Sequence, residues 1–149
     1  MSRESELKWK ISTDDDNISL HDCLISKASV GKDIILFFDD GFDVTSKNIC
    51  NETGRHKRTG AAAVILHNAI YEKGVKFLPE NKEKEIAISE ISGIDFEVLD
   101  FYFDNETGIV EISGDAWDEC VFCKLKFKAG KISYCWNEFV DDAWFQDWE

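Results

Sequence analysis

The chain contains 149 residues, of which 44% are hydrophobic and 13% are aromatic. This size and composition suit one packed domain, and the abundance of aromatic residues excludes a disordered chain. The net charge of −13 is uneven: residues 1–84 carry 14 acidic and 13 basic side chains, whereas residues 85–149 carry 16 and 4. An acidic surface repels nucleic acids and membranes and attracts basic proteins. We therefore expect no nucleic acid and no membrane as a partner.

Residues 18–29 alternate apolar and polar side chains, which predicts a strand. The apolar run at 33–38 predicts a second strand, and the Asp-Gly pair after it predicts a hairpin to residues 42–45. Residues 46–60 are irregular and contain the basic cluster Arg55–Arg58. We expect a long exposed loop there. The cluster could bind phosphate or pair with the acidic half of the chain, and a solvated loop is favoured over an anion site.

Residues 61–69 predict a buried strand, although their alanines leave a helix open. Residues 72–85 are charged and contain Pro79, and are therefore expected to form a connector. Residues 85–92 fit either a strand or one helical turn, because their isoleucines satisfy neither period cleanly.

The second half of the chain has clearer patterns. Residues 96–113 predict two strands around a turn at 104–108. Residues 121–128 alternate in polarity, and Ala129-Gly130 predicts a hairpin turn into residues 132–136. The residues from Asp141 onward show no period that fits an element.

These patterns amount to about eight short strands, three hairpins and no long helix. They predict a mostly β domain, with a β-rich α+β domain as the variant. The expected architecture is an antiparallel sheet, either a sandwich or a strongly curved sheet with several hairpins. We expect a single domain over residues 1–149, with an acidic, aromatic C-terminal tail at 138–149.

The cysteines and histidines do not predict a metal site. His21 and Cys23 would face one side of a strand, whereas Cys120 and Cys123 would face opposite sides. Neither arrangement supplies the close ligand pairs of a zinc site. The five cysteines are odd in number and irregularly spaced, which does not fit a disulfide framework. We predict no cofactor, and cysteines packed as small apolar groups.

Composition also indicates the compartment and the type of activity. No apolar run has the length of a signal peptide or a membrane span, so we expect a cytoplasmic protein. No nucleophile signature or phosphate-binding glycine pattern is present. We predict no catalytic residue and expect a protein that is not an enzyme.

The acidic second half predicts a surface that attracts a basic protein partner. Tryptophan is a frequent anchor of such interfaces. The alternative for Trp144 and Trp148 is that they close the core. The residues expected to contact the partner are Asp115, Trp117, Asp118, Glu119, Asp141, Asp142, Trp144, Asp147 and Trp148.

The chain resembles a known family in its acidity, its size and one stretch of sequence. That stretch contains His21-Asp22-Cys23, the β-forming run at 34–38 and the turn Asp39-Asp40-Gly41 followed by Phe42. In these features the chain is similar to the small acidic immunity proteins of bacterial polymorphic-toxin and contact-dependent growth inhibition systems. The resemblance implies an inhibitor that binds and blocks one cognate toxin, which we expect to be basic and nuclease-like.

Two hypotheses from other classes stay open. A small hydrolase that uses carboxylates or a metal predicts acidic side chains that converge in a deep cleft. A structural subunit of a homo-oligomer predicts a mass that depends on concentration. The oligomeric state itself is not predicted by the sequence.

Overall fold

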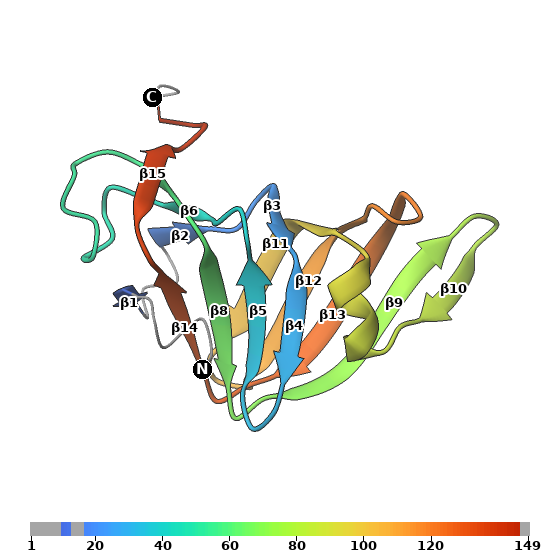
Figure 1. The fold of residues 1–149 in the computed structure, drawn as a ribbon. Coiled ribbons are helices and arrows are strands. Elements are labelled where there is room, and N and C mark those ends of the chain that lie inside the picture. The colour runs from blue at the N-terminus through green and yellow to red at the C-terminus, as the bar shows by residue number, and fades with distance from the viewer. Residues whose placement is uncertain (1–9, 13–16, 147–149) are drawn as a thin grey trace.

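The computed structural model describes residues 10–12 and 17–146. It is a mostly β structure in which all strand pairs are antiparallel, as the sequence predicts. Two large sheets face each other, and a small third sheet lies at one end (Figure 1). In the described part of the chain, no helix has the length and apolar character required to cross a membrane.

Each sheet brings together strands that are distant in the sequence. From one edge to the other, the five-stranded sheet contains β1 (Lys10–Ser12), β14 (Lys131–Trp136), β8 (Ala62–His67), β5 (Ile34–Phe38) and β4 (Lys27–Val30). In the same sense, the six-stranded sheet contains β10 (Lys82–Glu85), β9 (Ile70–Leu78), β13 (Val121–Lys128), β12 (Ile109–Ala116), β11 (Phe96–Asp104) and β3 (Cys23–Ile25). The four-stranded sheet contains β15 (Phe139–Asp142), β7 (Lys57–Thr59), β6 (Asp43–Val44) and β2 (Ile18–Ser19).

The core lies between the two large sheets. In β13, every second side chain from Cys123 to Phe127 is buried and the lysines between them are exposed, as the alternation predicts. Phe42 joins this core from the loop after β5, and its ring lies 6.2 Å from Tyr134 and 6.0 Å from Trp136. Such edge-to-face contacts add to the stability that burial provides.

The 3-10 helix η2 (Ile88–Gly93) lies beside β4, where it covers one end of the space between the sheets (Figure 1). Its Ile91 is buried, and its Ser92 hydroxyl accepts a hydrogen bond from the amide of Ala28 at 3.1 Å. Of the two alternatives for residues 85–92, the helical turn is the one found.

Two of the three predicted hairpins are wrong. The turn at Asp39–Gly41 exists, but β5 pairs with β4 and β8, whereas β6 pairs with β2 and β7. Gly41 has a φ of +80° and packs so closely on Thr59 that a Cβ would lie 2.2 Å from the Thr59 carbonyl oxygen. The chain therefore leaves the large sheet at this turn. The turn at 129–130 likewise joins β13 and β14 in different sheets. The hairpin of β11 and β12 is confirmed.

The predicted strand at 18–29 is broken into three. Asp22 has a φ of 64°, which a continuous strand does not allow. Asp22 separates β2 from β3, and the chain breaks again at Ser26 between β3 and β4. The three strands each join a different sheet. The buried strand predicted at 61–69 is confirmed by β8.

The predicted connector at 72–85 is instead the hairpin of β9 and β10. It extends beyond the layers (Figure 1), and all four charged side chains of β10 are exposed. Its turn follows Pro79 and contains Glu80 and Asn81, both with positive φ, which suits the twist of a tight hairpin.

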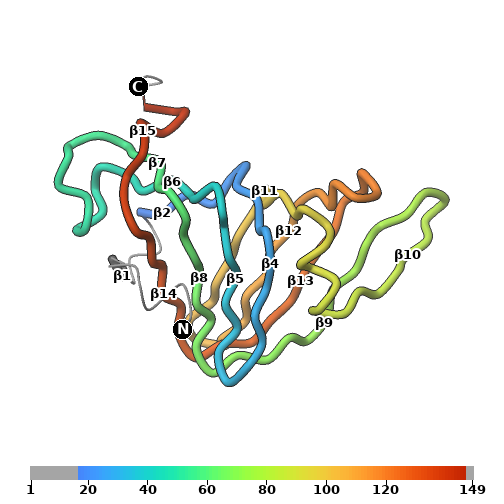
Figure 2. Tube along the Cα trace, in the orientation of Figure 1, coloured from blue at the N-terminus to red at the C-terminus, as the bar shows by residue number. Residues whose placement is uncertain are grey.

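The segment at 46–60 is more ordered than the predicted exposed loop, although it projects on the side opposite the β9–β10 hairpin (Figure 2). The side-chain amide of the buried Asn51 donates to the backbone carbonyls of Val44, Thr45 and Arg55 at 2.8–3.2 Å. These bonds satisfy backbone carbonyls that strand pairing would satisfy in a sheet. The segment then continues into β7. The tail is also more regular than predicted, because β15 pairs with β7.

Candidate functional site

The predicted contact residues fall into two groups on different elements. Asp115 lies near the end of β12, and Trp117, Asp118 and Glu119 form the turn into β13. The other group comprises Asp141 and Asp142 of β15 and Trp144 just after it. Asp147 and Trp148 lie outside the described residues. The prediction that these residues contact a partner stays a prediction.

Three of the predicted acidic residues are already paired within the chain. The Lys76 ammonium, whose side chain is 3% exposed, lies 2.8 Å from Asp118 and 2.6 Å from Glu119. Burial opposes its charge, but the hydrogen bonds that the ammonium donates to both carboxylates outweigh burial and raise the pKa of Lys76. Asp142 lies 2.8 Å from both Arg55 and Lys57. The basic cluster therefore pairs in part with the acidic half, which is one of the alternatives that the sequence left open.

Hydrogen bonds from Arg55 and Lys57 hold the pKa of Asp142 well below its ordinary value. A lowered carboxyl pKa adds stability above the unfolded-state pKa, about 3.9, and this stability is lost as the pH falls toward the folded-state pKa. We expect the Asp142→Asn variant to melt below the wild type at pH 7 and low salt, and the difference to shrink below about pH 4. Melting curves at pH 7, 4 and 3 would check this. A difference that is constant over this range would contradict it.

Asp22 and Glu97 lie between the two groups, and with Asp115 of the first group they form a set of three carboxylates from three different segments, which we name the acidic rim. Glu97 of β11 is directly opposite Asp115 of β12 in the ladder. The amide of Asp22 donates to the Val98 carbonyl at 2.7 Å, which places Asp22 beside Glu97. Partial burial, a side-chain hydrogen bond with Asp22 and the charges of Asp22 and Asp115 raise the pKa of Glu97. The rim is therefore a concentration of like charge.

An exposed tryptophan lies at each end of the rim. Trp117 is 52% exposed and hydrogen-bonds with the carboxylate of Glu97. Trp144 is 47% exposed, and its ring lies 6.4 Å from that of His21, which is adjacent to Asp22. The alternative that Trp144 closes the core is therefore wrong. One surface runs from Trp117 across the three carboxylates and His21 to Trp144.

The positive charge of Arg58, which contacts the residue next to Asp22, is directed inward. Arg58 donates to the buried Asp43 carboxylate at 3.3 Å, to the Cys23 sulfur at 3.2 Å and to the Asp40 carbonyl at 3.0 Å. Among the described residues, no lysine or arginine forms an ion pair with Asp22, Glu97 or Asp115. The rim therefore presents carboxylates that no lysine or arginine of the described residues neutralises, although His21 Nε2 lies 3.7 Å from the Asp22 carboxylate.

The cysteines do not form the pairs that were considered from the sequence. His21 lies in a turn and is exposed while Cys23 is buried, so the two do not share a face as expected. Burial raises the pKa values of Cys23 and Cys123 to about 11, so both thiols are protonated at neutral pH. Within the described ranges, no three His, Cys, Asp or Glu side chains gather closely enough to hold a metal ion.

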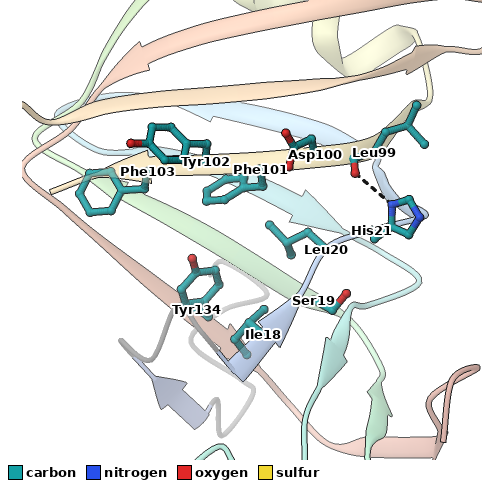
Figure 3. Close-up of a pocket in the computed structure, with 10 residues that line it drawn as sticks. All are labelled: Ile18, Ser19, Leu20, His21, Leu99, Asp100, Phe101, Tyr102, Phe103 and Tyr134. Carbon is teal, nitrogen blue, oxygen red and sulfur yellow. Dashed lines mark hydrogen bonds between the residues drawn. The ribbon is translucent and has the colours of Figure 1, made fainter. Parts of the chain in front are cut away.

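A cavity of about 420 Å³ lies beside the rim, between β2 and β11 (Figure 3). His21 lies at its edge, and its Nδ1 is 3.0 Å from the Leu99 carbonyl oxygen. The apolar side chains that line the cavity are those of Ile18, Leu20, Leu99, Phe101, Phe103 and Tyr134. Asp100 and Tyr102 of β11 complete its border.

Asp22, Glu97 and His21 were not predicted from the sequence as parts of this surface. Each was visible as a charged or polar residue, but their proximity depends on strand register and on the break at Asp22. The fold and this surface define an antiparallel β-sandwich with an acidic face between two exposed tryptophans. Comparison with known proteins adds no relative: no family model, no curated protein and no solved structure matches the chain.

Proposed function

We propose that the protein is an inhibitor that binds a basic protein through the acidic rim, Trp117 and Trp144, and blocks that protein's working surface. The observation behind this proposal is the cluster of three carboxylates, Asp22, Glu97 and Asp115, between two exposed tryptophans, with no lysine or arginine partner among the described residues. Exposed tryptophans supply apolar anchor area, and the charge speeds encounter with a partner of opposite sign. A basic nuclease-like toxin suits this surface, because such an enzyme must hold phosphates.

The rim refines the predicted contact set. Asp115, Trp117 and Trp144 belong to the surface described above. Asp118 and Glu119 are held by Lys76, and Asp142 is held by Arg55 and Lys57. A partner that used these three carboxylates would have to compete with those bonds. We therefore place the main electrostatic contribution on Asp22, Glu97 and Asp115.

The test is capture of partners from the native host with the purified chain as bait, at low salt and at ~0.5 M salt, where exposed charges are screened. The matched baits are a triple rim variant, with Asp22, Glu97 and Asp115 changed to Lys, and a triple control. The control changes the exposed Glu52, Glu72 and Glu106 to Lys and so has the same net charge.

We expect the wild type and the control to retain one basic protein at low salt and release it at high salt, while the rim variant retains none. The purified partner should then associate with the rim variant at least tenfold more slowly than with the control. Equal loss in both variants would mean that overall charge, and not the rim, governs binding. Unchanged binding by the rim variant would overturn the proposal.

A further inference from the structure

The strand β11 has one edge that is only partly used. It pairs with β12 from Phe96 to Asp104, but with β3 only from Phe96 to Val98. Beyond Val98, no strand in the described part of the chain pairs with this edge. An unpaired strand edge presents backbone donors and acceptors to which another extended chain can add.

The direction of the backbone groups can be followed from Leu99. A β-bulge lies between Val98 and Asp100, and the carbonyls of both Val98 and Leu99 point toward the open edge. Asp22 and His21 respectively meet these two carbonyls. Because backbone groups alternate along a strand, Phe101 and Phe103 direct their amides and carbonyls to the same open edge.

The cavity lies directly beside this edge, and its lining combines apolar and polar surface in about equal parts. Phe101 and Phe103 are partly buried and form one wall, and Tyr134 lies across the cavity from them (Figure 3). Asp100 and Tyr102 alternate with these phenylalanines, are exposed, and lie toward the other face of the sheet. A strand added at this edge would thus place one set of side chains into the cavity and the other set beside Asp100.

We propose that β11 from Leu99 to Phe103 receives an extended segment of the basic partner, in which apolar residues alternate with lysine or arginine. The apolar residues enter the cavity, and the basic residues lie beside Asp100. This inference rests on the proposed function, because it identifies how the same partner is held. His21 links the two surfaces: its Nδ1 contacts the Leu99 carbonyl, and its ring lies near Trp144.

The probe is a capped seven-residue peptide in which lysine and valine alternate. The control peptide has the same composition, but its lysines and its valines are grouped in two separate runs. Binding is measured by calorimetry and by amide exchange of the ¹⁵N-labelled protein. We expect the alternating peptide to bind at least tenfold more tightly and to slow amide exchange at Phe101 and Phe103. Equal binding of both peptides, or unchanged exchange at these amides, would overturn the inference.

N-methylated peptides test the ladder without altering the protein. The amides of an added strand point alternately toward and away from β11. N-methylation of one alternating set should therefore abolish binding, while methylation of the other set should be tolerated. An equal effect of the two sets would mean that no ladder forms.

A pair of protein variants tests the cavity. Phe101→Asp places a charge in the cavity and should weaken peptide binding at least tenfold, whereas Ile70→Asp, at the exposed start of β9 and outside the cavity lining, should not. If Phe101→Asp fails to fold by circular dichroism, the peptide comparisons decide alone. Rim-dependent capture without alternating-peptide binding would overturn only this inference. Peptide binding at the edge without rim-dependent capture would overturn only the proposed function.

Discussion

A Gly114→Ala variant is expected to be less stable than the wild type by about 1–3 kcal/mol, the usual cost of forcing atoms into a packed region. Gly114 pairs with Val98 at the bulge of β11, and a Cβ at this position would lie 1.9 Å from the carbonyl oxygen of Glu97. This oxygen belongs to the backbone and cannot rotate away, so the two strands must separate. For a chain of this size the melting temperature should fall by roughly 2–4 °C per kcal/mol.

Gly93→Ala is the matched control, because no atom lies within 4 Å of a Cβ at Gly93. Its stability should stay within about 0.5 kcal/mol of the wild type. Denaturant unfolding of the three proteins gives the comparison directly. Equal stability of the two variants would contradict the close approach of β11 and β12 at the bulge. Because that approach positions Glu97, Gly114→Ala should also weaken partner binding, whereas Gly93→Ala should not.

The strands that the sequence predicts well are those whose pattern is set by one buried face. In β13 the alternation from Cys123 to Phe127 corresponds directly to burial in the sandwich. In β5 the buried Ile34, Leu36 and Phe38 follow the same period, although the whole run is apolar. A period of two depends only on local strand geometry and on which face of the strand is buried, so it can be recognised in a single sequence.

The pairing of these strands could not be predicted, because it depends on distant residues. The Asp-Gly signal correctly indicates a turn at Gly41, but the close contact of Gly41 with Thr59 directs the chain into the small sheet. The turn at 129–130 likewise connects two sheets, and the Gly130 amide donates to the His67 carbonyl at 2.8 Å. A turn signal specifies a change of direction and not the strand that follows as a partner.

The same limit applies to the candidate site. Trp117 and Trp144 stand out in the sequence as aromatic residues among acidic ones, and both are exposed. Their connection through Glu97 and Asp22 depends on the register of β11 against β12 and β3. The pairing of Lys76 with Asp118 and Glu119 joins residues more than forty positions apart. Charge density along the chain therefore predicts that the surface is acidic, but not which of its carboxylates are already neutralised.

Replacing Trp117 or Trp144 by alanine should weaken binding of the captured basic protein by about 2–4 kcal/mol each, or roughly 30- to 1,000-fold in Kd. Both side chains expose about half of their surface, so each can bury apolar area only when a partner covers it. The loss should occur mainly in the dissociation rate, because short-range packing acts after encounter. Lysine substitutions in the rim should instead slow association, and surface plasmon resonance separates the two rates.

Ile70→Ala is the control for these two variants, since Ile70 is also exposed and apolar but lies at the start of β9, away from the rim (Figure 1). It should leave both rate constants unchanged. An effect at Trp117 alone would confine the interface to the β12–β13 turn and the adjacent carboxylates. An effect at Trp144 alone would shift it toward His21 and the open edge of β11. Equal, small effects at all three positions would mean that neither tryptophan anchors the partner, and binding would then rest on charge alone.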